Sequence, residues 1–427
     1  MNLSLLNEKA VRNSSVTELN KIKLNLHETS PDSMIITDVR TTVIHLPFIR
    51  PYRWTFGSMQ GATSLIIQIS TDENTVGVGE GTCPFYPNIS PDISKLIVDS
   101  SRQLLLNEDP FDIERIILKL YAFAGWHFAR HMANWVFGGV EMALWDLVGK
   151  TCKRPLYQLF GGCLRRKIPF FGFVFRDNIE VMVGEARKYV EEGFKTLYLK
   201  VGLDEEEELQ QIGKIRDALG YNVALRLDAN EAWTPGAAIR FIKKMERFEP
   251  EFIEQPVSAS DLDGMIRVRN AVGVPILADQ CSRTLSEASN VVRRGAADAL
   301  STSPLDAEGI AGCRKVAAVA EAAGLPVIMH SNVETGLATA SFLQIIASTP
   351  NFLYANQTEL PHLSGDILKD TGLKFENGCL EVPDKPGLGV ELDWDKIRKY
   401  ADIYTKSIAK QPTKPEPFSA TPRTPHL

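Results

Sequence analysis

The sequence lacks the features that mark disulfide-rich, membrane-spanning and polyanion-binding proteins. Its six cysteines lie far apart and form no Cys-x-x-Cys pair, so we expect buried free thiols rather than disulfides or a zinc site. No apolar run reaches roughly 18 residues, and the first residues lack the basic and apolar stretches of a secretory leader. The net charge of -6 comes without a cluster of lysine and arginine. These absences predict a soluble, cytoplasmic protein that acts on a small molecule and has no nucleic-acid or membrane partner.

The composition is that of an ordinary globular protein. The chain has 427 residues, of which 44% are hydrophobic and 23% are charged. Residues 1–33 are polar and residues 411–427 contain five prolines, so we expect both segments to be extensions outside the fold. Residues 34–155 have the pattern of strands followed by helices, which predicts an α+β capping domain. We expect residues 389–410 to pack back on the fold.

The intervening residues, 156–388, alternate short apolar segments with amphipathic helices such as 205–219 and 310–323. Eight strand candidates follow one another, from 168–175 to 351–355. This pattern predicts an α/β fold, a TIM-like (β/α)8 barrel, with the α+β domain as its cap. A doubly wound open sheet is the alternative, but no glycine-rich phosphate turn follows the first strand.

Polar residues end six successive strand candidates of this barrel. They are separated by 24 to 28 residues, which is the pitch of one βα unit. Their side chains should therefore lie together on the carboxy-terminal rim, where active sites of this fold are built. The six residues are Lys200, Asp228, Glu254, Asp279, Ser303 and His330.

Three of these residues are carboxylates on consecutive strands: Asp228, Glu254 and Asp279. A single carboxylate at a strand end is more often a helix cap, but three together would repel one another without a counter-ion. An all-oxygen set of ligands favours Mg²⁺, or Mn²⁺, over zinc. Such a cation can hold a substrate carboxylate and stabilise the enediolate that forms when the neighbouring carbon loses its proton.

Lys200 ends the strand that precedes the first carboxylate. Alternation along this strand puts Lys200 on the same face as Tyr198, and Leu197 and Leu199 on the other face. A lysine at a strand end commonly extends to solvent, but the three adjacent carboxylates favour Lys200 as the base that removes the α-proton. His330 lies across the predicted ring and is the candidate second acid or base, although a lone histidine is more often structural.

Six motifs, taken together, resemble those of the enolase superfamily, in its mandelate racemase and muconate lactonizing enzyme group. The resemblance runs from about Ile35 to Leu388. It implies Mg²⁺ on the three carboxylates, Asn230 near the metal, Lys200 as the second lysine of a Lys-x-Lys motif, and a homo-oligomer. The motifs are GGVEMALWDLVGKTCKRPLYQLFGG, LKVG, LRLDANEAW, FIEQP, ILADQ and VETGLATA.

The same resemblance implies that two loops of the capping domain, near residues 50–59 and 83–90, close over the substrate. With them, the segment FVFRD would select the substrate. Within it, Phe173, Phe175 and Arg176 are equally compatible with a pocket and with packing beside a surface charge.

Two departures from the family pattern lie beside the expected metal. Tyr198 replaces the first lysine of Lys-x-Lys, and a phenol donates a hydrogen bond without supplying a positive charge. Gln280 follows Asp279 where the family commonly has a glutamate, which leaves open which side chain completes the metal shell.

A third departure lies opposite Lys200. Ser303 stands where the family carries either a lysine or the aspartate of an Asp-His dyad. A two-lysine epimerase is therefore not expected, and His330 lacks its usual carboxylate. Asp306 and Glu334 are both candidates to replace that carboxylate.

These residues predict Mg²⁺-dependent removal of the proton alpha to a carboxylate of a small acid. Dehydration of a hydroxy or sugar acid is preferred by analogy, because acid-sugar dehydratases commonly pair this lysine with this histidine. Racemisation, epimerisation and cycloisomerisation are the alternatives. A Schiff-base enzyme would not need three carboxylates, and a non-catalytic protein that binds a Mg²⁺-carboxylate complex is a lower alternative. The residues expected to bind substrate are Tyr198, Asn230, Ser303, Glu334 and Arg176.

Overall fold

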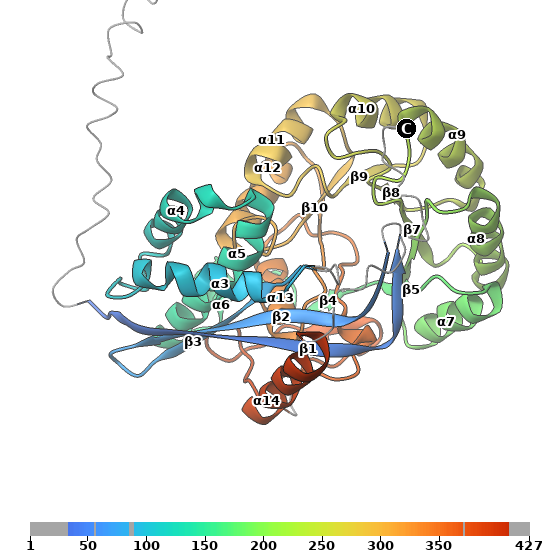
Figure 1. Cartoon of the computed structure of the whole chain (residues 1–427). Helices are drawn as coiled ribbons and strands as arrows, with labels where there is room; N and C mark the ends of the chain where they lie inside the picture. Colours follow the sequence, from blue (N-terminus) through green and yellow to red (C-terminus); the bar gives the residue numbers. More distant parts are fainter. Residues whose placement is uncertain (1–32, 55–56, 85–88, 370–371, 410–427) are drawn as a thin grey trace, which may run out of the picture.

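The computed structural model describes residues 33–54, 57–84, 89–369 and 372–409 (Figure 1). The expected amino-terminal extension, apart from Ser33, and the proline-rich tail lie outside these ranges. The expected boundaries of the other segments stay predictions.

The amino-terminal part is an antiparallel sheet of three strands with helices packed on it. The strands β1 (Ile36–Trp54), β2 (Gly57–Thr71) and β3 (Val76–Thr82) are paired in sequence order. The long helix α5 (Arg130–Thr151) approaches β3 closely, because a Cβ on Gly77 or Gly79 would lie 2.1 Å from a carbonyl oxygen of this helix. The other helices here are α3 (Asp92–Ser101), η1 (Arg102–Leu104), α4 (Ile113–Phe123), η2 (Gly125–His127) and α6 (Leu156–Leu159).

The larger part is a curled sheet of seven parallel strands, whose order in the sheet is their order in the chain. Helices follow the strands in alternation and cover the outside of the curl (Figure 1). The predicted TIM-like fold is confirmed to the extent that a curled parallel sheet is covered on its outside by helices. The strands are β5 (Gly172–Val174), β6 (Thr196–Lys200), β7 (Ala224–Asp228), β8 (Phe252–Glu254), β9 (Ile276–Ala278), β10 (Ala299–Thr302) and β11 (Val327–Met329). The helices are α7 (Ile179–Glu191), α8 (Glu205–Leu219), α9 (Pro235–Met245), η3 (Glu246–Phe248), α10 (Leu262–Ala271), α11 (Leu285–Arg294), α12 (Ile310–Ala322) and α13 (Gly336–Ser348).

The eighth predicted strand, 351–355, does not form, so the prediction of eight regular strands is wrong at this position. Side-chain amides replace part of the backbone ladder here. Asn356 Oδ1 accepts a hydrogen bond from the backbone N–H of Met329 at 2.9 Å, and Gln357 Oε1 accepts one from Ser331 at 3.2 Å. On its other side, Asn356 forms an isolated parallel bridge with Phe170. An irregular segment therefore links the two edges of the curled sheet.

The first predicted barrel strand, 168–175, is divided in two. β4 (Lys167–Pro169) pairs antiparallel with β12 (Cys379–Glu381), and only β5 enters the curled sheet. Pro169 has no N–H to continue a ladder, and its carbonyl accepts from the Asn356 backbone at 2.9 Å. After η4 (Leu360–His362) and β12, the helix α14 (Trp394–Ile403) packs on β1 and continues into the π-helical turn η5 (Tyr404–Ile408).

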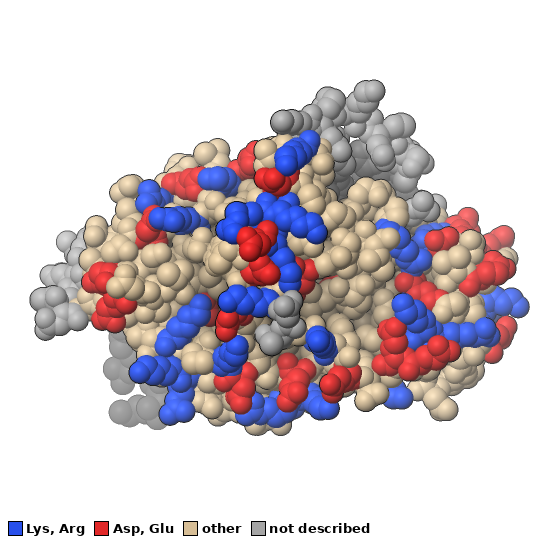
Figure 2. Space-filling model, turned by 90° about the horizontal axis from the view of Figure 1, so that it is seen from below, with Lys and Arg blue, Asp and Glu red and all other residues tan. Residues whose placement is uncertain are grey.

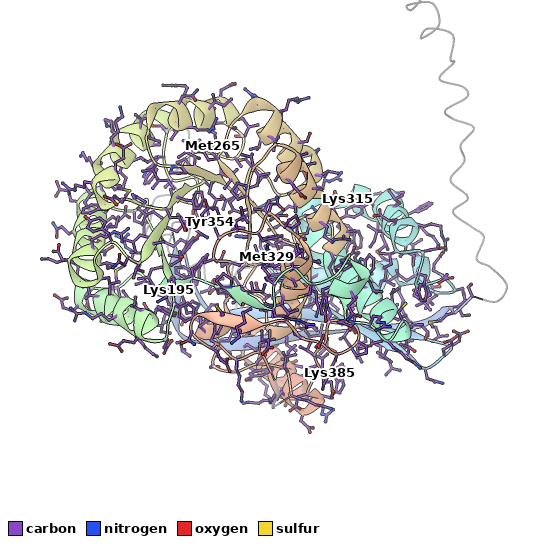
Figure 3. All side chains as sticks on the ribbon, turned by 180° about the vertical axis from the view of Figure 1, so that it is seen from behind. Lys195, Met265, Lys315, Met329, Tyr354 and Lys385 are labelled. Carbon is purple, nitrogen blue, oxygen red and sulfur yellow. The ribbon has the colours of Figure 1, made fainter. Side chains whose placement is uncertain are left out.

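An apolar layer fills the inside of the curl beneath the carboxy-terminal rim. Its members come from four neighbouring strands and from the irregular segment, and Figure 3 shows Tyr354 inside the curl. Three of the strand members stand two positions before a rim residue and Ala299 stands four positions before Ser303, so each lies on the same inward face as that residue. The layer consists of Phe252, Leu277, Ala299, Ile328 and Tyr354.

Carboxylates of the amino-terminal domain hold the two parts of the molecule together. Glu80 accepts hydrogen bonds from the backbone of the first turn of α13, and Glu141 accepts from the first turn of α12. Asp146 accepts from the backbone N–H of Leu388 at 2.9 Å. All three carboxylates are buried, so the contact between the domains depends on polar groups shielded from water.

The surface and the cysteines agree in part with the expectations. On the face shown in Figure 2, basic and acidic residues are interspersed. Among the described residues, no helix combines the length and the apolar character needed to cross a bilayer. All six cysteines are free, as predicted, but only Cys83, Cys281 and Cys313 are buried, and Cys152 is exposed.

Candidate active site

The ends of three adjacent strands bring Lys200, Asp228 and Glu254 side by side. Strand register pairs Lys200 with Asp228 across β6 and β7, and Asp228 with Glu254 across β7 and β8. Asp279 follows β9 directly, and all four residues are buried. The carboxy-terminal rim therefore carries one amine and three carboxylates in strand order.

Lys200 forms an ion pair with Asp228, and its Nζ donates a hydrogen bond to the hydroxyl of Tyr198 at 3.2 Å. The Tyr198 hydroxyl in turn donates to the same oxygen of Asp228. Burial is the largest single effect and lowers the pKa of Lys200, but the surrounding acidic groups, Asp228 first among them, together raise it more, so the pKa lies above its usual range. In this contact Lys200 is an ammonium. A cation held by Asp228 would remove the cause of that rise and favour the neutral amine.

The carboxylates meet the requirements of a hard cation site. Burial raises the pKa of Glu254 well above its usual range, and the charges of Asp228 and Asp279 raise it further. Asp279 Oδ2 and Asn230 Oδ1 are buried and have no hydrogen-bond partner among the described residues. Crowded carboxylates and unsatisfied buried oxygens are both explained by a cation with oxygen ligands.

The structure brings one set of possible ligands for such a cation close together, and it overlaps the predicted set of three carboxylates. Ligand atoms of Glu254, Asp279 and His330 lie within 4.8 Å of one another. Asp228 is not part of this set, and both of its oxygens have protein partners: one accepts from the Asn230 N–H at 2.8 Å, and the other is engaged by Lys200. Mg²⁺ prefers oxygen ligands, which favours the three carboxylates over the set that includes the histidine.

His330 lies between two carboxylates. Its Nδ1 is 3.6 Å from Asp279 Oδ1, and its Nε2 is 4.0 Å from Asp306 Oδ2. Both distances exceed that of a hydrogen bond, and Nδ1 is buried without a partner among the described residues. Of the two candidate dyad carboxylates, Asp306 is therefore the one beside His330. Glu334 instead accepts from Ser331 Oγ at 2.6 Å, and burial raises the pKa of Glu334 to about 8.

Two other expected substrate-binding residues have protein partners. Ser303 is fully buried, and its Oγ donates to Asn332 Oδ1 at 2.7 Å. Arg176 belongs to the loop between β5 and α7, and its terminal nitrogens form ion pairs with Glu207 and Glu208 in the first turn of α8, at 2.6 and 2.7 Å. Their roles toward substrate stay predictions.

Sequence reasoning missed a buried arginine beneath the carboxylates. Arg226 has no exposed surface, pairs with Glu251 at 2.6 Å, and lies over the rings of Phe171 and Phe252. Its charge lowers the pKa of Glu254, against the larger opposing effect of burial. Strand alternation could have predicted this position, because Arg226 stands two residues before Asp228 and therefore lies on the same inward face.

Sequence reasoning also missed Tyr52, which β1 of the amino-terminal domain brings to the site. Burial raises the pKa of Tyr52, and Lys200, which is hydrogen-bonded to Tyr52, acts in the opposite direction. The ring packs edge-on against Phe173 and Phe175, at 5.2 Å between ring centroids in each case. Both phenylalanines are buried, as the packing interpretation requires. No local pattern points to Tyr52, since only the packing of the two domains brings it near β6.

The two capping-domain loops expected over the substrate are described only in part, because residues 55–56 and 85–88 lie outside the described ranges. Their closure over a substrate stays a prediction.

The chain is similar to families and proteins of known activity over most of its length. Residues 36–161 match the family described as mandelate racemase / muconate lactonizing enzyme, N-terminal domain, and residues 181–396 match the family described as enolase C-terminal domain-like. L-Ala-D/L-Glu epimerase of Bacillus subtilis is 31% identical over 84% of this chain and 97% of its own. Chloromuconate cycloisomerase of Cupriavidus pinatubonensis is 31% identical over 86% of this chain and 98% of its own.

Solved structures agree with these matches. Muconate lactonizing enzyme from Pseudomonas fluorescens, in complex with muconolactone, superposes with a TM-score of 0.81 at 27% identity, covering 86% of this chain and 99% of its own. Dipeptide epimerase from Enterococcus faecalis, in complex with Mg and L-Leu-L-Tyr, gives a TM-score of 0.78 at 27% identity, covering 84% of this chain and 99% of its own. With both domains matched in order, the chain belongs to the enolase superfamily, in the mandelate racemase / muconate lactonizing enzyme group.

Proposed function

We propose that this protein removes the proton alpha to the carboxylate of a small organic acid and catalyses an isomerisation. The observation that carries the proposal is the buried amine of Lys200, which lies in contact with Asp228 at the edge of three adjacent carboxylates. The similar proteins are named epimerases, racemases and cycloisomerases, which supports isomerisation over the loss of water expected from the sequence.

Asp228, Glu254 and Asp279 are the proposed ligands of Mg²⁺, with Mn²⁺ as a chemically suitable substitute. The bound cation supplies positive charge next to the substrate carboxylate, where negative charge develops as the α-proton leaves. Asn230 adds a buried carbonyl oxygen to this region.

As a neutral amine, Lys200 takes the α-proton on its Nζ while the bond from the neighbouring carbon to the lactone oxygen breaks. In the reverse direction that bond forms by intramolecular addition, and the Lys200 ammonium gives its proton to the α-carbon. The Tyr198 hydroxyl orients the amine through its contacts with Nζ and with Asp228. A single acid-base group is sufficient for cycloisomerisation, in which the proton and the new bond involve different carbon atoms. Ser303, buried and bonded to Asn332, offers no second base, which disfavours exchange between two lysines.

Dehydration of a hydroxy acid is the second candidate, and His330 is the observation that favours it. Its Nδ1 is buried without a partner among the described residues, while Asp306 lies beside Nε2. An imidazole in this position can give a proton to a departing hydroxyl after Lys200 has taken the α-proton.

The test is mass spectrometry of small carboxylic acids incubated with the Mg²⁺-loaded protein in D₂O. A product that has gained deuterium but lost no water indicates isomerisation, and a product that has lost water indicates dehydration. Chromatography detects a lactone isomer. Lys200→Ala should slow α-proton exchange by at least about 100-fold, because a positioned base contributes roughly that much or more. The matched control is Lys195→Ala, which changes an exposed lysine immediately before β6 (Figure 3) and should leave exchange unchanged.

Retained exchange in Lys200→Ala would remove this residue from the mechanism. Binding of acids with no exchange in the wild-type protein would instead support the non-catalytic alternative.

The metal assignment has its own test in Glu254→Gln. Loss of one charged ligand should weaken Mg²⁺ binding, measured by calorimetry, by at least about tenfold. Glu321→Gln, which changes an exposed glutamate of α12, is the control. Equal Mg²⁺ affinity in wild type and Glu254→Gln would contradict the assignment.

A further inference from the structure

The carboxy-terminal rim carries a set of possible metal ligands that differs from the three predicted carboxylates. It consists of Glu254 at the end of β8, Asp279 after β9 and His330 after β11, and their ligand atoms lie within 4.8 Å of one another. Figure 3 labels Met329, the last residue of β11, immediately before the histidine. Two ligands of one cation are at most about 4.2 Å apart, because each bond is about 2.1 Å long. Small side-chain movements therefore close this set, which we call the histidine set, around a cation.

Two atoms of the histidine set are buried without a hydrogen-bond partner among the described residues. They are Oδ2 of Asp279 and Nδ1 of His330. Nδ1 is 3.6 Å from the other oxygen of Asp279, which is too far for a hydrogen bond. A neutral imidazole nitrogen without a proton is an acceptor, and so is a carboxylate oxygen, so neither can satisfy the other. A cation bound by both would satisfy both.

The other nitrogen of His330 lies toward Asp306. Its Nε2 is 4.0 Å from Asp306 Oδ2. Hydrogen bonds from Trp135 and Asn332, at 3.0 and 3.1 Å, hold the two oxygens of this carboxylate in place. A histidine that binds a metal through one nitrogen commonly has a carboxylate on the side of the other, which fixes the tautomer and the ring orientation. Asp306 lies on the side where such a carboxylate is needed.

Asp228 keeps its protein partners when a cation binds to the histidine set. One of its oxygens accepts from the Asn230 N–H at 2.8 Å, and the other accepts from Lys200 and Tyr198. A cation bound by the three carboxylates competes with these donors for Asp228. The histidine set leaves all of these hydrogen bonds in place.

The donor atoms of the histidine set indicate which cations suit it. Two carboxylates and one imidazole combine hard oxygen ligands with a softer nitrogen ligand. Mg²⁺ prefers oxygen ligands, whereas imidazole suits Zn²⁺, Fe²⁺, Ni²⁺ and related first-row transition cations. Three protein ligands also leave positions on the cation open to water or substrate.

We propose that Glu254, Asp279 and His330 bind a first-row transition cation, in a mode that omits Asp228 and differs from the proposed Mg²⁺ site. The two modes share Glu254 and Asp279, so one cation excludes the other. The inference rests on the part of the proposed function that puts a cation at these two carboxylates, and it does not depend on the proposed proton transfer. A nitrogen bound to a cation carries no proton, so a cation in the histidine set withdraws Nδ1 of His330 from the acid chemistry of the second candidate reaction.

The test is calorimetric titration of the full chain, freed of metal with a chelator, with Co²⁺ and separately with Mg²⁺. His330→Asn should weaken Co²⁺ binding by at least about tenfold, because it removes the nitrogen ligand, and should change Mg²⁺ binding by less than about threefold. Asp228→Asn should show the opposite pattern, with Mg²⁺ binding weakened by at least about tenfold and Co²⁺ binding changed by less than about threefold.

The matched control is His131→Asn. His131 also lies beside Asp306, with 3.7 Å between its Nδ1 and Oδ1, but it is outside the histidine set. Its Nε2 instead accepts a hydrogen bond at 2.8 Å from Arg283, which belongs to the loop between β9 and α11. This variant should leave the affinities for both cations unchanged.

Co²⁺ also reports its ligands directly. The proton NMR spectrum of the Co²⁺-loaded wild-type protein should contain a strongly shifted imidazole N–H signal that disappears in D₂O and is missing from His330→Asn. If His330→Asn does not fold, as judged by circular dichroism, His330→Gln takes its place in both measurements.

Three outcomes would overturn the inference and leave the proposed Mg²⁺ site standing. They are equal Co²⁺ affinity in the His330 variant and wild type, absence of the shifted signal, and equal losses of Co²⁺ and Mg²⁺ affinity in Asp228→Asn. Co²⁺ binding that depends on His330, in a protein that does not bind Mg²⁺, would support the inference and contradict the proposed Mg²⁺ site. A protein that binds neither cation would contradict both.

Discussion

At the scale of single residues, the environment of Lys200 depends on phenols. Tyr198 shares one oxygen of Asp228 with the amine, and Tyr52 reaches the same amine from the amino-terminal domain. Neither phenol supplies a positive charge, and burial raises the pKa of both. In this site, hydrogen bonds rather than a neighbouring cationic side chain orient the proposed base.

Tyr198→Phe tests that orientation. The variant keeps the ring, which stacks on Phe171 at 4.6 Å between centroids, and removes only the hydroxyl. We expect α-proton exchange to slow by about tenfold, because loss of one hydrogen bond to a charged group costs about 1.5 kcal/mol or more. Mg²⁺ affinity should change little. Isotope exchange and calorimetry measure the two effects.

The control is Tyr221→Phe, since Tyr221 is exposed and its hydroxyl donates to the backbone carbonyl of Arg247 at 3.4 Å. An exchange rate in Tyr198→Phe equal to that of wild type would show that the hydroxyl does not orient the amine.

At the scale of elements, the start of α12 is completed by a residue of α5. The N-cap of α12 is Gly309, which has no side chain to accept the first N–H groups. Glu141 accepts from Ile310 at 2.6 Å and from Ala311 at 2.9 Å instead. A Cβ at position 309 would lie 2.5 Å from the Glu141 carboxyl, which leaves no room for a side chain. The φ angle of +107° at this position also favours glycine. Burial raises the pKa of Glu141 to about 7.

This raised pKa predicts a pH dependence of stability. Between about pH 4.5, the usual pKa, and about pH 7, the folded state keeps a proton on Glu141 that the unfolded state has lost. The contribution of Glu141 to stability therefore falls as pH rises through this window and is constant above it. Between about pH 5 and about pH 8, the unfolding free energy of wild type should fall by more than that of Glu141→Gln, with a difference of at most about 3 kcal/mol.

Denaturant titrations at both pH values measure this difference, with Glu321→Gln as the exposed control that retains the wild-type dependence. The same pH dependence in Glu141→Gln and wild type would show that Glu141 does not keep its proton in this window.

At the scale of the whole molecule, the amino-terminal domain reaches the rim on two sides. On one side, Arg50 of β1 forms an ion pair with Glu185 of α7 and lies 5.0 Å from the centre of the Phe175 ring. On the other side, His131 of α5 holds Arg283. The site between them thus depends on how the two domains dock, as well as on the curled sheet.

Arg50→Met tests the first of these contacts. The change leaves the partly buried carboxylate of Glu185 without the Arg50 guanidinium that pairs with it. Burial already raises the pKa of this carboxyl. We expect the free energy of unfolding to fall by about 1–3 kcal/mol. Proteolytic cleavage near the end of β1 should also become faster, because the ion pair that joins β1 to α7 is lost. Denaturant unfolding and limited proteolysis measure both effects.

Arg40→Met, which changes an exposed arginine of the same strand, is the control and should have neither effect. Cleavage at the same rate in Arg50→Met and wild type would show that the ion pair does not hold the hairpin.

Much of this architecture follows from local pattern. Alternating strands and helices predict a parallel curled sheet, and the spacing of Lys200, Asp228 and Glu254 places them at equivalent strand ends. Strand alternation and the length of a βα unit are local properties, so they can be read over a few residues. The predicted helix 205–219 has the bounds of α8, and the predicted helix 310–323 differs from α12 by one residue.

What only the tertiary structure decided concerns contacts between distant segments. It selected Asp306 over Glu334 beside His330, replaced the eighth strand with an irregular segment, brought Tyr52 to Lys200, and joined Arg283 to His131. The sequence by itself determined the family, the rim carboxylates and the inward lysine. The other contacts were beyond it because they depend on domain docking and loop conformation, in which side chains far apart in the chain compete for the same buried donors and acceptors.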